Sequence, residues 1–175
     1  MIQSTLCYLE KDGCYLMLHR VKKKNDVNHD KWIGVGGKFE DGESPEDCMK
    51  REVLEETGLT VTGWAYRGIV TFVSDQAETE YMHLFLASDW TGDLSACDEG
   101  TLEWIPLERV PSLPSWEGDR IFLDYLRDKT MPFFSLKLVY EGERLLFAER
   151  DGRRIPAGKN KKPGIPGLDG VDEWT

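Results

Sequence analysis

The 175-residue sequence lacks several features that mark broad classes of protein. It has no run of about 18 apolar residues, so a membrane-spanning helix is not expected. Its first residues lack the basic stretch and cleavage site of a secretory signal. Its four cysteines are scattered without a Cys-x-x-Cys spacing, which is typical of free thiols in a reducing compartment. We therefore expect a cytoplasmic protein that neither contacts a membrane nor depends on disulfides.

Positive charge is also scarce. The chain has 22 Lys and Arg against 32 Asp and Glu, which gives a formal net charge of −10. The segment from Ser74 to Glu103 contains no Lys or Arg at all. This balance disfavours binding to polymeric nucleic acid, which usually requires a basic face. It still permits a small nucleotide substrate, because a divalent cation can reverse the local charge.

The length and the 40% hydrophobic content predict one folded domain over residues 1–150. Residues 3–9 and 14–20 are expected to form two strands around a Lys-Asp-Gly turn. Further strands are expected at 61–73, 81–88, 101–105, 134–140 and 144–149. The segment 151–175 is rich in Gly, Pro and Lys, so we expect a tail with little structure of its own.

Two helices are predicted. The first starts at Ser44, a good N-cap residue, and Pro45 suits the first helical position. It is expected to end near Thr57, because Gly58 is a natural C-terminal cap. The second is expected over 117–128, where apolar residues recur on one face.

Three carboxylates lie on one face of the first helix. Glu52, Glu55 and Glu56 are spaced i, i+3 and i+4. Like charges at this spacing repel each other, and no lysine is interleaved with them to compensate. The alternatives are a solvated acidic face or a site for a hard cation, and oxygen ligands suit Mg²⁺ or Mn²⁺.

The residues around this stripe favour the second alternative. Gly37 is followed after five residues by Glu43, and after seven more by Arg51-Glu52-Val53. One residue separates this run from Glu55-Glu56, and one more separates Glu56 from Gly58-Leu59. This pattern is similar to the Nudix hydrolase signature at every specified position. The resemblance implies an α/β fold, namely an α/β/α sandwich with a mixed central sheet. It also implies hydrolysis of a nucleoside diphosphate linked to another group.

A wider resemblance covers residues 3–149. Lys31-Trp32, Gly34 to Lys38, Asp98-Glu99 and the pair Trp116 and Asp119 look like the MutT-like 8-oxo-dGTP diphosphatases. The two resemblances together imply a set of site residues. Metal ligands would be Glu52, Glu55, Glu56 and the Gly37 carbonyl, Arg51 would orient the glutamates, and Arg20 and Lys38 would bind phosphate. The general base is left open among the three helix glutamates and Glu99.

Base recognition is expected from Trp116, which can stack on a purine, and from Asp119, which can accept hydrogen bonds from its edge. Phe72 and Ile33 are candidates for the wall of the same pocket. The sequence departs from the vertebrate branch at two positions. Ile33 replaces an asparagine, and Gly118-Asp119 replaces a pair of adjacent carboxylates. The base would therefore lose one amide and one carboxylate partner.

Three functions follow as hypotheses. The first is Mg²⁺-dependent hydrolysis of an oxidised purine nucleoside triphosphate to the monophosphate and pyrophosphate, a reaction of nucleotide-pool sanitation and DNA repair. The second is hydrolysis of another nucleoside diphosphate derivative: a nucleotide sugar, a dinucleotide or a pyrimidine triphosphate. The third is a non-catalytic nucleotide-binding module, which would not need the repulsive triplet. The choice between a monomer and a homodimer stays open.

Overall fold

The structure is a computed structural model that describes residues 1–156. Most of the predicted tail, residues 157–175, lies outside the described residues. Neither α-helix within 1–156 is long and apolar enough to cross a membrane.

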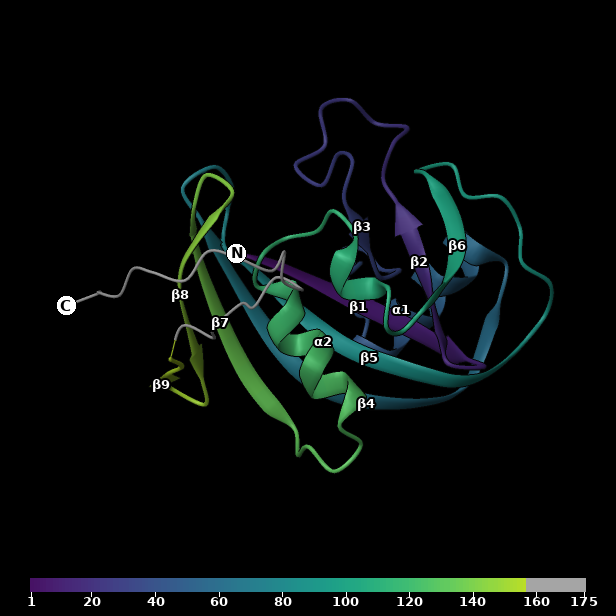
Figure 1. The fold of residues 1–175 in the computed structure, drawn as a ribbon. Helices are drawn as coiled ribbons and strands as arrows, with labels where there is room; N and C mark the ends of the chain where they lie inside the picture. Colours follow the sequence, from purple (N-terminus) through teal and green to yellow (C-terminus); the bar gives the residue numbers. More distant parts are fainter. Residues whose placement is uncertain (157–175) are drawn as a thin grey trace, which may run out of the picture.

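The strands form one nine-stranded mixed sheet (Figure 1). Their order is β3-β2-β1-β5-β4-β7-β8-β9, and β6 pairs with β2. The pairs β1–β5 and β4–β7 are parallel, and the other pairs are antiparallel. The strands are β1 (Ile2–Lys11), β2 (Cys14–His19), β3 (Trp32–Ile33), β4 (Thr60–Ser74), β5 (Glu80–Thr91), β6 (Thr101–Pro106), β7 (Phe134–Glu141), β8 (Arg144–Arg150) and β9 (Arg153–Arg154).

Both predicted helices are confirmed. Helix α1 (Pro45–Thr57) begins with a capping box, in which the Ser44 hydroxyl accepts from the Asp47 N–H and the Asp47 carboxylate accepts from the Ser44 N–H. It ends at Gly58, whose φ of 78° is left-handed as expected for a C-cap. Helix α2 (Asp119–Arg127) is shorter than predicted, and a 3₁₀ turn (Val110–Ser112) precedes it.

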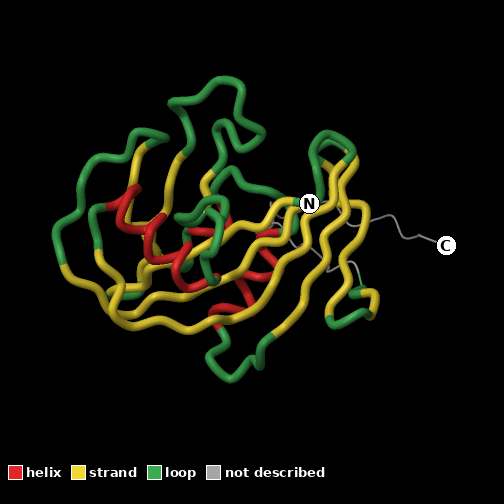
Figure 2. Tube along the Cα trace, turned by 180° about the vertical axis from the view of Figure 1, so that it is seen from behind, coloured by secondary structure: helices red, strands yellow, loops and turns green. Residues whose placement is uncertain are grey.

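The two helices cover opposite faces of the sheet (Figures 1 and 2). Alternate residues of β1 show this, because successive side chains of a strand point to opposite faces. Cys7 and Leu9 pack in one core cluster with Met49 of α1. Tyr8 packs in the other cluster with Phe122 of α2. The predicted α/β/α sandwich with a mixed central sheet is therefore confirmed.

The end of α2 is held by a buried arginine of β4. The Arg67 side chain donates hydrogen bonds to the carbonyls of Tyr125, Leu126 and Asp128. The last carbonyls of a helix have no partner within the helix, so Arg67 satisfies groups that burial would otherwise leave unpaired. Arg67 thereby fixes the helix whose first residue is Asp119.

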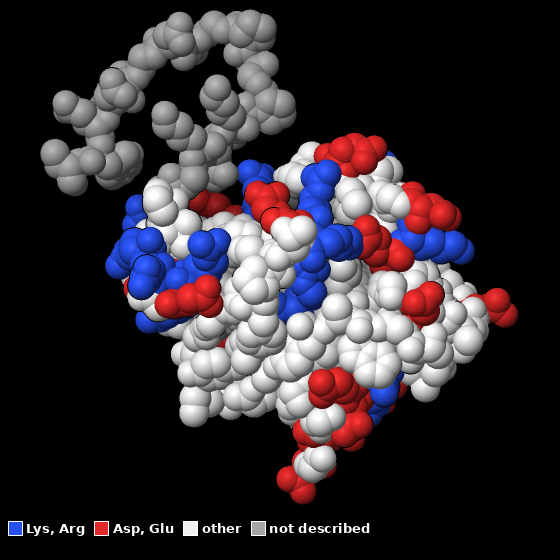
Figure 3. Space-filling view, turned by 90° about the horizontal axis from the view of Figure 1, so that it is seen from below, with Lys and Arg blue, Asp and Glu red and all other residues white. Residues whose placement is uncertain are grey.

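The sheet continues past residue 150, further than the sequence predicts. Asp151 and Gly152, with φ of 50° and 77°, form a tight turn into β9, which pairs with β8. Ile155 then packs against the α2-side core. The polar composition of this stretch resembles that of an unstructured tail. Its Asp-Gly pair nevertheless forms a hairpin, because such a pair readily adopts the positive φ that the turn needs. On the face seen in Figure 3, a stripe of Lys and Arg runs from the upper edge into the middle, and a wide uncharged area lies below it.

Candidate active site

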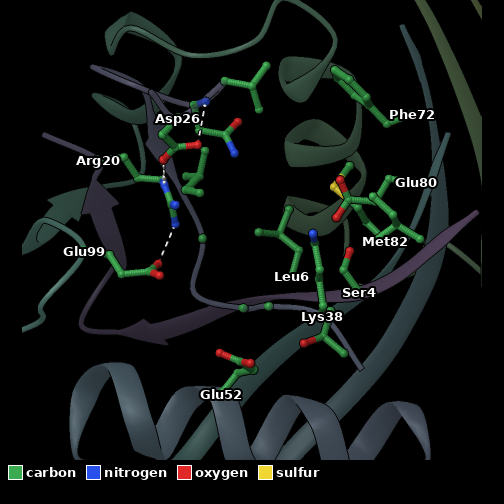
Figure 4. A pocket seen from close by; sticks show the side chains of 18 of the residues that line it. Ser4, Leu6, Arg20, Asp26, Lys38, Glu52, Phe72, Glu80, Met82 and Glu99 are labelled. Carbon is green, nitrogen blue, oxygen red and sulfur yellow. Dashed lines mark hydrogen bonds and ion pairs between the residues drawn. The ribbon is translucent and has the colours of Figure 1, made fainter. Parts of the chain in front are cut away.

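A cavity of about 770 Å³ lies between β1, the glycine segment 34–37, α1 and the loop 21–31. Eleven of the twelve predicted site residues line it: Arg20, Ile33, Gly37, Lys38, Arg51, Glu52, Glu56, Phe72, Glu99, Trp116 and Asp119. Figure 4 shows Glu52 rising from α1 at one end and Phe72 at the far side. The twelfth residue, Glu55, does not line the cavity. Its side chain is 57% exposed and pairs with Arg51 at 3.3 Å.

The backbone of the glycine segment lies against strand β1 on one side and against the Glu52 side chain of α1 on the other. Thr5 of β1 donates its N–H to the Gly37 carbonyl at 2.9 Å. A Cβ on Gly36 would lie 1.9 Å from the Thr5 carbonyl oxygen, and a Cβ on Gly37 would lie 2.3 Å from the Glu52 carboxyl carbon. Neither position has room for a side chain. The absence of side chains lets the Glu52 carboxylate lie directly against the chain.

Arg51 organises the carboxylates at this end. Its guanidinium donates to Glu52 at 2.7 Å, to Glu43 at 2.9 Å and to the Lys38 carbonyl at 3.0 Å. Such charge-assisted bonds are strong and directional. The hydrogen bond from Arg51 lowers the pKa of Glu43 to about 2. Glu43 therefore acts with Arg51 as a brace between the loop and α1.

Glu56 is the most buried of the three helix glutamates, at 7% exposure. Its Oε2 accepts from the Gly36 N–H at 3.0 Å. Burial, followed by the hydrogen bond and charge of Glu99, raises the pKa of Glu56 to about 9. For Glu99, burial opposes ionisation, but the hydrogen bonds from Lys23 and Glu56 bring its pKa below the ordinary value.

The donors at this end suit a hard divalent cation. The Glu52, Glu56 and Glu99 carboxylates and the Gly37 carbonyl are all oxygen ligands, which Mg²⁺ and Mn²⁺ prefer. A cation at this end would neutralise the charge of both the buried Glu56 and the half-buried Glu99, which repel each other when both are ionised. Within residues 1–156 the acidic groups do not converge into a formed ligand cluster. Arg51 accounts for part of this, since it holds Glu52 and Glu55.

The two predicted phosphate-binding residues differ. Lys38 is exposed at the cavity wall, and its side chain extends between Ser4 and Leu6 (Figure 4). Arg20 is paired with Asp26 and, at 2.6 Å, with Glu99. The structure thus brings Arg20 to the cavity with its charge already neutralised. It acts there as an anchor for the loop that follows β2.

The far end of the cavity is aromatic. Trp116 is 5% exposed and packs edge-on against Phe72 and Tyr140, each with a centroid separation of 5.1 Å. The Lys31 ammonium lies 4.6 Å from its ring centroid. Little of the indole is therefore open for stacking. Asp119 is buried beside it, and burial raises the pKa of its carboxyl to about 8.

Two further residues at this end were missed by sequence reasoning. Asn28 Oδ1 accepts from the Trp116 indole N–H at 2.8 Å, and Asn28 lines the cavity. The Tyr140 hydroxyl accepts from the Gly118 N–H at 2.8 Å, which ties the start of α2 to β7. The Asn-Asp-Val-Asn run at 25–28 was the available signal for Asn28, because Asx residues form local turns. Nothing in the sequence pattern pointed to Tyr140.

Comparison with known proteins agrees with this geometry. The family model described as NUDIX domain matches residues 3–126. The chain is 33% identical over 127 residues to the "Uncharacterized Nudix hydrolase YvcI" of Bacillus subtilis (strain 168), covering 70% of this chain and 77% of that protein. It is 34% identical over 109 residues to the "Oxidized purine nucleoside triphosphate hydrolase" of Danio rerio, covering 61% and 69%.

A solved structure extends the similarity to the fold. The mMutator MutT protein from Bacillus halodurans aligns with a TM-score of 0.75 and 27% identity, covering 86% of this chain and 98% of that chain. Sequence and structure therefore point to the same family.

Proposed function

The chain belongs to the Nudix family of hydrolases, which act on phosphoric anhydride bonds, and we propose that it hydrolyses a purine nucleoside triphosphate, normal or oxidised, to the monophosphate and pyrophosphate. One observation carries this proposal. A single cavity joins a carboxylate end, with Glu52 and Glu56, to an aromatic end with Trp116 and Asp119. Its volume of about 770 Å³ falls in the range of small-molecule sites and suits a nucleotide.

The carboxylate end would hold Mg²⁺. Glu52, Glu56 and the Gly37 carbonyl are the proposed ligands, with Glu55 and Glu99 as further candidates. When bound, the ion neutralises phosphate charge and lowers the pKa of the attacking water. Lys38 binds phosphate oxygens, and Arg51 keeps Glu52 oriented through its hydrogen bond. Water oxygen attacks one phosphorus, the bridging P–O bond breaks, and a carboxylate at this end takes the water proton.

The aromatic end would hold the base. Trp116, Phe72 and Ile33 give an apolar wall, and Asp119 provides the polar contact to the base edge. The similarity to a protein named oxidized purine nucleoside triphosphate hydrolase supports a purine here. Nucleotide-pool sanitation is the role that fits such a reaction.

A pyrophosphate-release screen tests the proposal. The panel contains normal and oxidised purine triphosphates, pyrimidine triphosphates, nucleotide sugars and dinucleotides, each with and without Mg²⁺. We expect Mg²⁺-dependent pyrophosphate release, with the highest kcat/KM among purine triphosphates. Hydrolysis confined to nucleotide sugars or dinucleotides would replace the substrate assignment. Turnover that is unchanged without a divalent ion would contradict the metal assignment.

A further inference from the structure

A second cavity, of about 510 Å³, lies at the turn between β8 and β9 and shares no lining residue with the candidate active site. We call it the arginine cavity, because arginines contribute much of its lining: Tyr125, Arg150, Asp151, Arg153, Arg154, Ile155 and Pro156. Its volume falls in the range of small-molecule sites. Figure 3 shows Lys and Arg side chains gathered at the end of the molecule that carries β9, although the whole chain has a net charge of −10. The cavity therefore suits an anionic ligand.

Two of these arginines face each other across the hairpin. Arg150 and Arg153 lie directly opposite on the antiparallel pair β8–β9. Cβ atoms at such positions are about 5 Å apart, and like charges there destabilise a sheet. The Asp151 carboxylate offsets little of this repulsion, because it lies 4.0 Å from the Arg150 Nε and accepts from the Ser135 N–H at 3.0 Å. In the described part of the chain, Arg153 has no carboxylate within 4.0 Å. An anion between the two guanidinium groups would remove the repulsion.

Aromatic rings hold two of the arginines in place. The Arg150 guanidinium lies over the Tyr125 ring of α2, 5.5 Å from its centroid, and the Arg154 guanidinium lies over the Phe147 ring of β8 at 3.7 Å. Contact with a ring face restrains a guanidinium while the N–H donors in its plane stay available. These side chains can therefore donate to a ligand in the cavity that they line.

The backbone around the arginines is also fixed. Asp151 donates its N–H to the Ser135 carbonyl at 2.8 Å, so the turn is tied to the start of β7. Ile155 donates its N–H to the Ala148 carbonyl at 2.9 Å and packs against the α2-side core. The two strands that carry the facing arginines are thus held before any ligand arrives. A preformed site of this kind loses little conformational freedom on binding.

We propose that the arginine cavity binds a pyrophosphate group, either as free pyrophosphate or as the phosphate chain of a nucleotide. The segment 150–154 carries three positive charges and one negative charge, so a single carboxylate would leave a net positive charge. A pyrophosphate group places several negative charges on two adjacent phosphorus centres. Each centre can accept the paired N–H donors of one guanidinium. The arginines supply the positive charge, so this site needs no metal ion.

Calorimetric titration of the full chain with pyrophosphate in EDTA tests the proposal without any turnover, so its outcome is independent of the proposed hydrolysis. Arg153→Gln is the main variant, because Arg153 is exposed and its side chain can change without loss of the fold. We expect the wild type to bind, and the Kd to rise about tenfold or more in Arg153→Gln, as the loss of a charge-assisted hydrogen bond predicts. Pyrophosphate should also raise the melting temperature of the wild type more than that of the variant.

Arg144→Gln is the matched control, since it removes an exposed arginine of β8 that does not line the arginine cavity. It should leave the Kd unchanged. Lys38→Gln, in the candidate active site, should also leave it unchanged. Absence of binding by the wild type, or equal Kd values for the wild type and Arg153→Gln, would overturn the inference. A Kd that rises in Lys38→Gln instead would place the ion in the active site and overturn it too.

Titrations with ATP and with sulfate, at matched ionic strength in EDTA, identify the source of the phosphate group. A lower Kd for pyrophosphate than for ATP would support the free ion as the ligand. A lower Kd for ATP, still raised in Arg153→Gln, would support the phosphate chain of a nucleotide. Sulfate carries its charge on one centre, so we expect it to bind at least about tenfold more weakly. Equal affinity for sulfate and pyrophosphate would overturn the assignment of a pyrophosphate group.

Discussion

The two ends of the cavity are built in different ways. Most of the carboxylate end comes from one short stretch, the glycine segment and α1, where Arg51 holds Glu43 and Glu52, and only Glu99 joins it from a distant loop. The aromatic end collects Asn28, Phe72, Trp116 and Tyr140 from segments far apart in the chain. The first end therefore depends mainly on local structure, and the second depends on the whole sheet. Substrate choice can change through loops and hairpins while the hydrolytic end stays the same.

The largest expected effect is at the carboxylate end. Glu56→Gln should lower kcat by at least about 100-fold, because it removes a proposed metal ligand, and a factor of 100 is about 3 kcal/mol of activation free energy. The melting temperature should not fall, since a neutral side chain replaces a buried carboxyl. Pyrophosphate release and thermal melts measure the two effects.

Glu46→Gln, on the same helix but outside the cavity, is the control for this variant and should retain activity. Near-normal turnover in Glu56→Gln would remove the carboxylate end from the chemistry.

The next effect concerns the support of the aromatic end. Arg67→Met removes three hydrogen bonds to the last carbonyls of α2. We expect a loss of about 2–3 kcal/mol in the free energy of unfolding. KM should also rise more than kcat falls, because α2 carries Asp119. Arg120→Met, an exposed arginine of the same helix, is the control. A change in kcat alone would contradict the assignment of Arg67 to the aromatic end.

A smaller effect is expected from the protonation of Asp119. Burial raises its pKa from an ordinary 3.8 to about 8, so the folded state favours the neutral acid. This contribution to stability is complete below about pH 4 and is lost as the pH rises toward 8. Between pH 5 and pH 8 the wild type should lose at least about 1 kcal/mol, or ~2–4 °C in Tm, relative to Asp119→Asn. Asp124→Asn, at an exposed position of α2, should melt in parallel with the wild type. Parallel Tm curves for the wild type and Asp119→Asn would refute the burial argument.

The smallest effect is expected at the C-terminal end. Truncation after Pro156 should change the free energy of unfolding by less than about 0.5 kcal/mol and leave kcat/KM unchanged, as the composition of the tail predicts. Truncation after Arg150 should cost more, because it removes β9 and the packed side chain of Ile155. Equal melting temperatures for the two shortened chains would show that β9 and Ile155 do not contribute to the stability of the fold.

The sequence predicted those parts that local rules determine. The cap at Ser44, the end of α1 at Gly58 and the strand pattern all depend on near neighbours along the chain. The spacing of the glutamates predicted one helix face, but it could not show that Arg51 draws Glu55 out of the cavity. The family resemblance predicted Arg20 as a phosphate ligand, and this role stays a prediction. The motif could not reveal the partners, Asp26 and Glu99, with which Arg20 pairs in the structure.

Asn28 and Tyr140 were missed for a related physical reason. Each acts through a single long-range hydrogen bond, to Trp116 and to Gly118, and neither bond leaves a periodic signal in the sequence. The hairpin at Asp151 was missed because polar turn residues resemble a tail until their partner strand is known. Tertiary packing decides such cases.

The adjacent glycines at the centre of the site differ in what limits their replacement during evolution. A methyl group at Gly36 would strike the Thr5 backbone, which cannot move without opening the strand contact, so drift there is limited by folding. At Gly37 the three nearest atoms that a methyl group would meet belong to the Glu52 carboxylate, so a side chain there would displace a proposed metal ligand, and drift there is limited by hydrolysis. Selection on neighbouring codons would thus act on two separate traits. A lineage that abandoned hydrolysis and kept nucleotide binding could lose Gly37 while retaining Gly36.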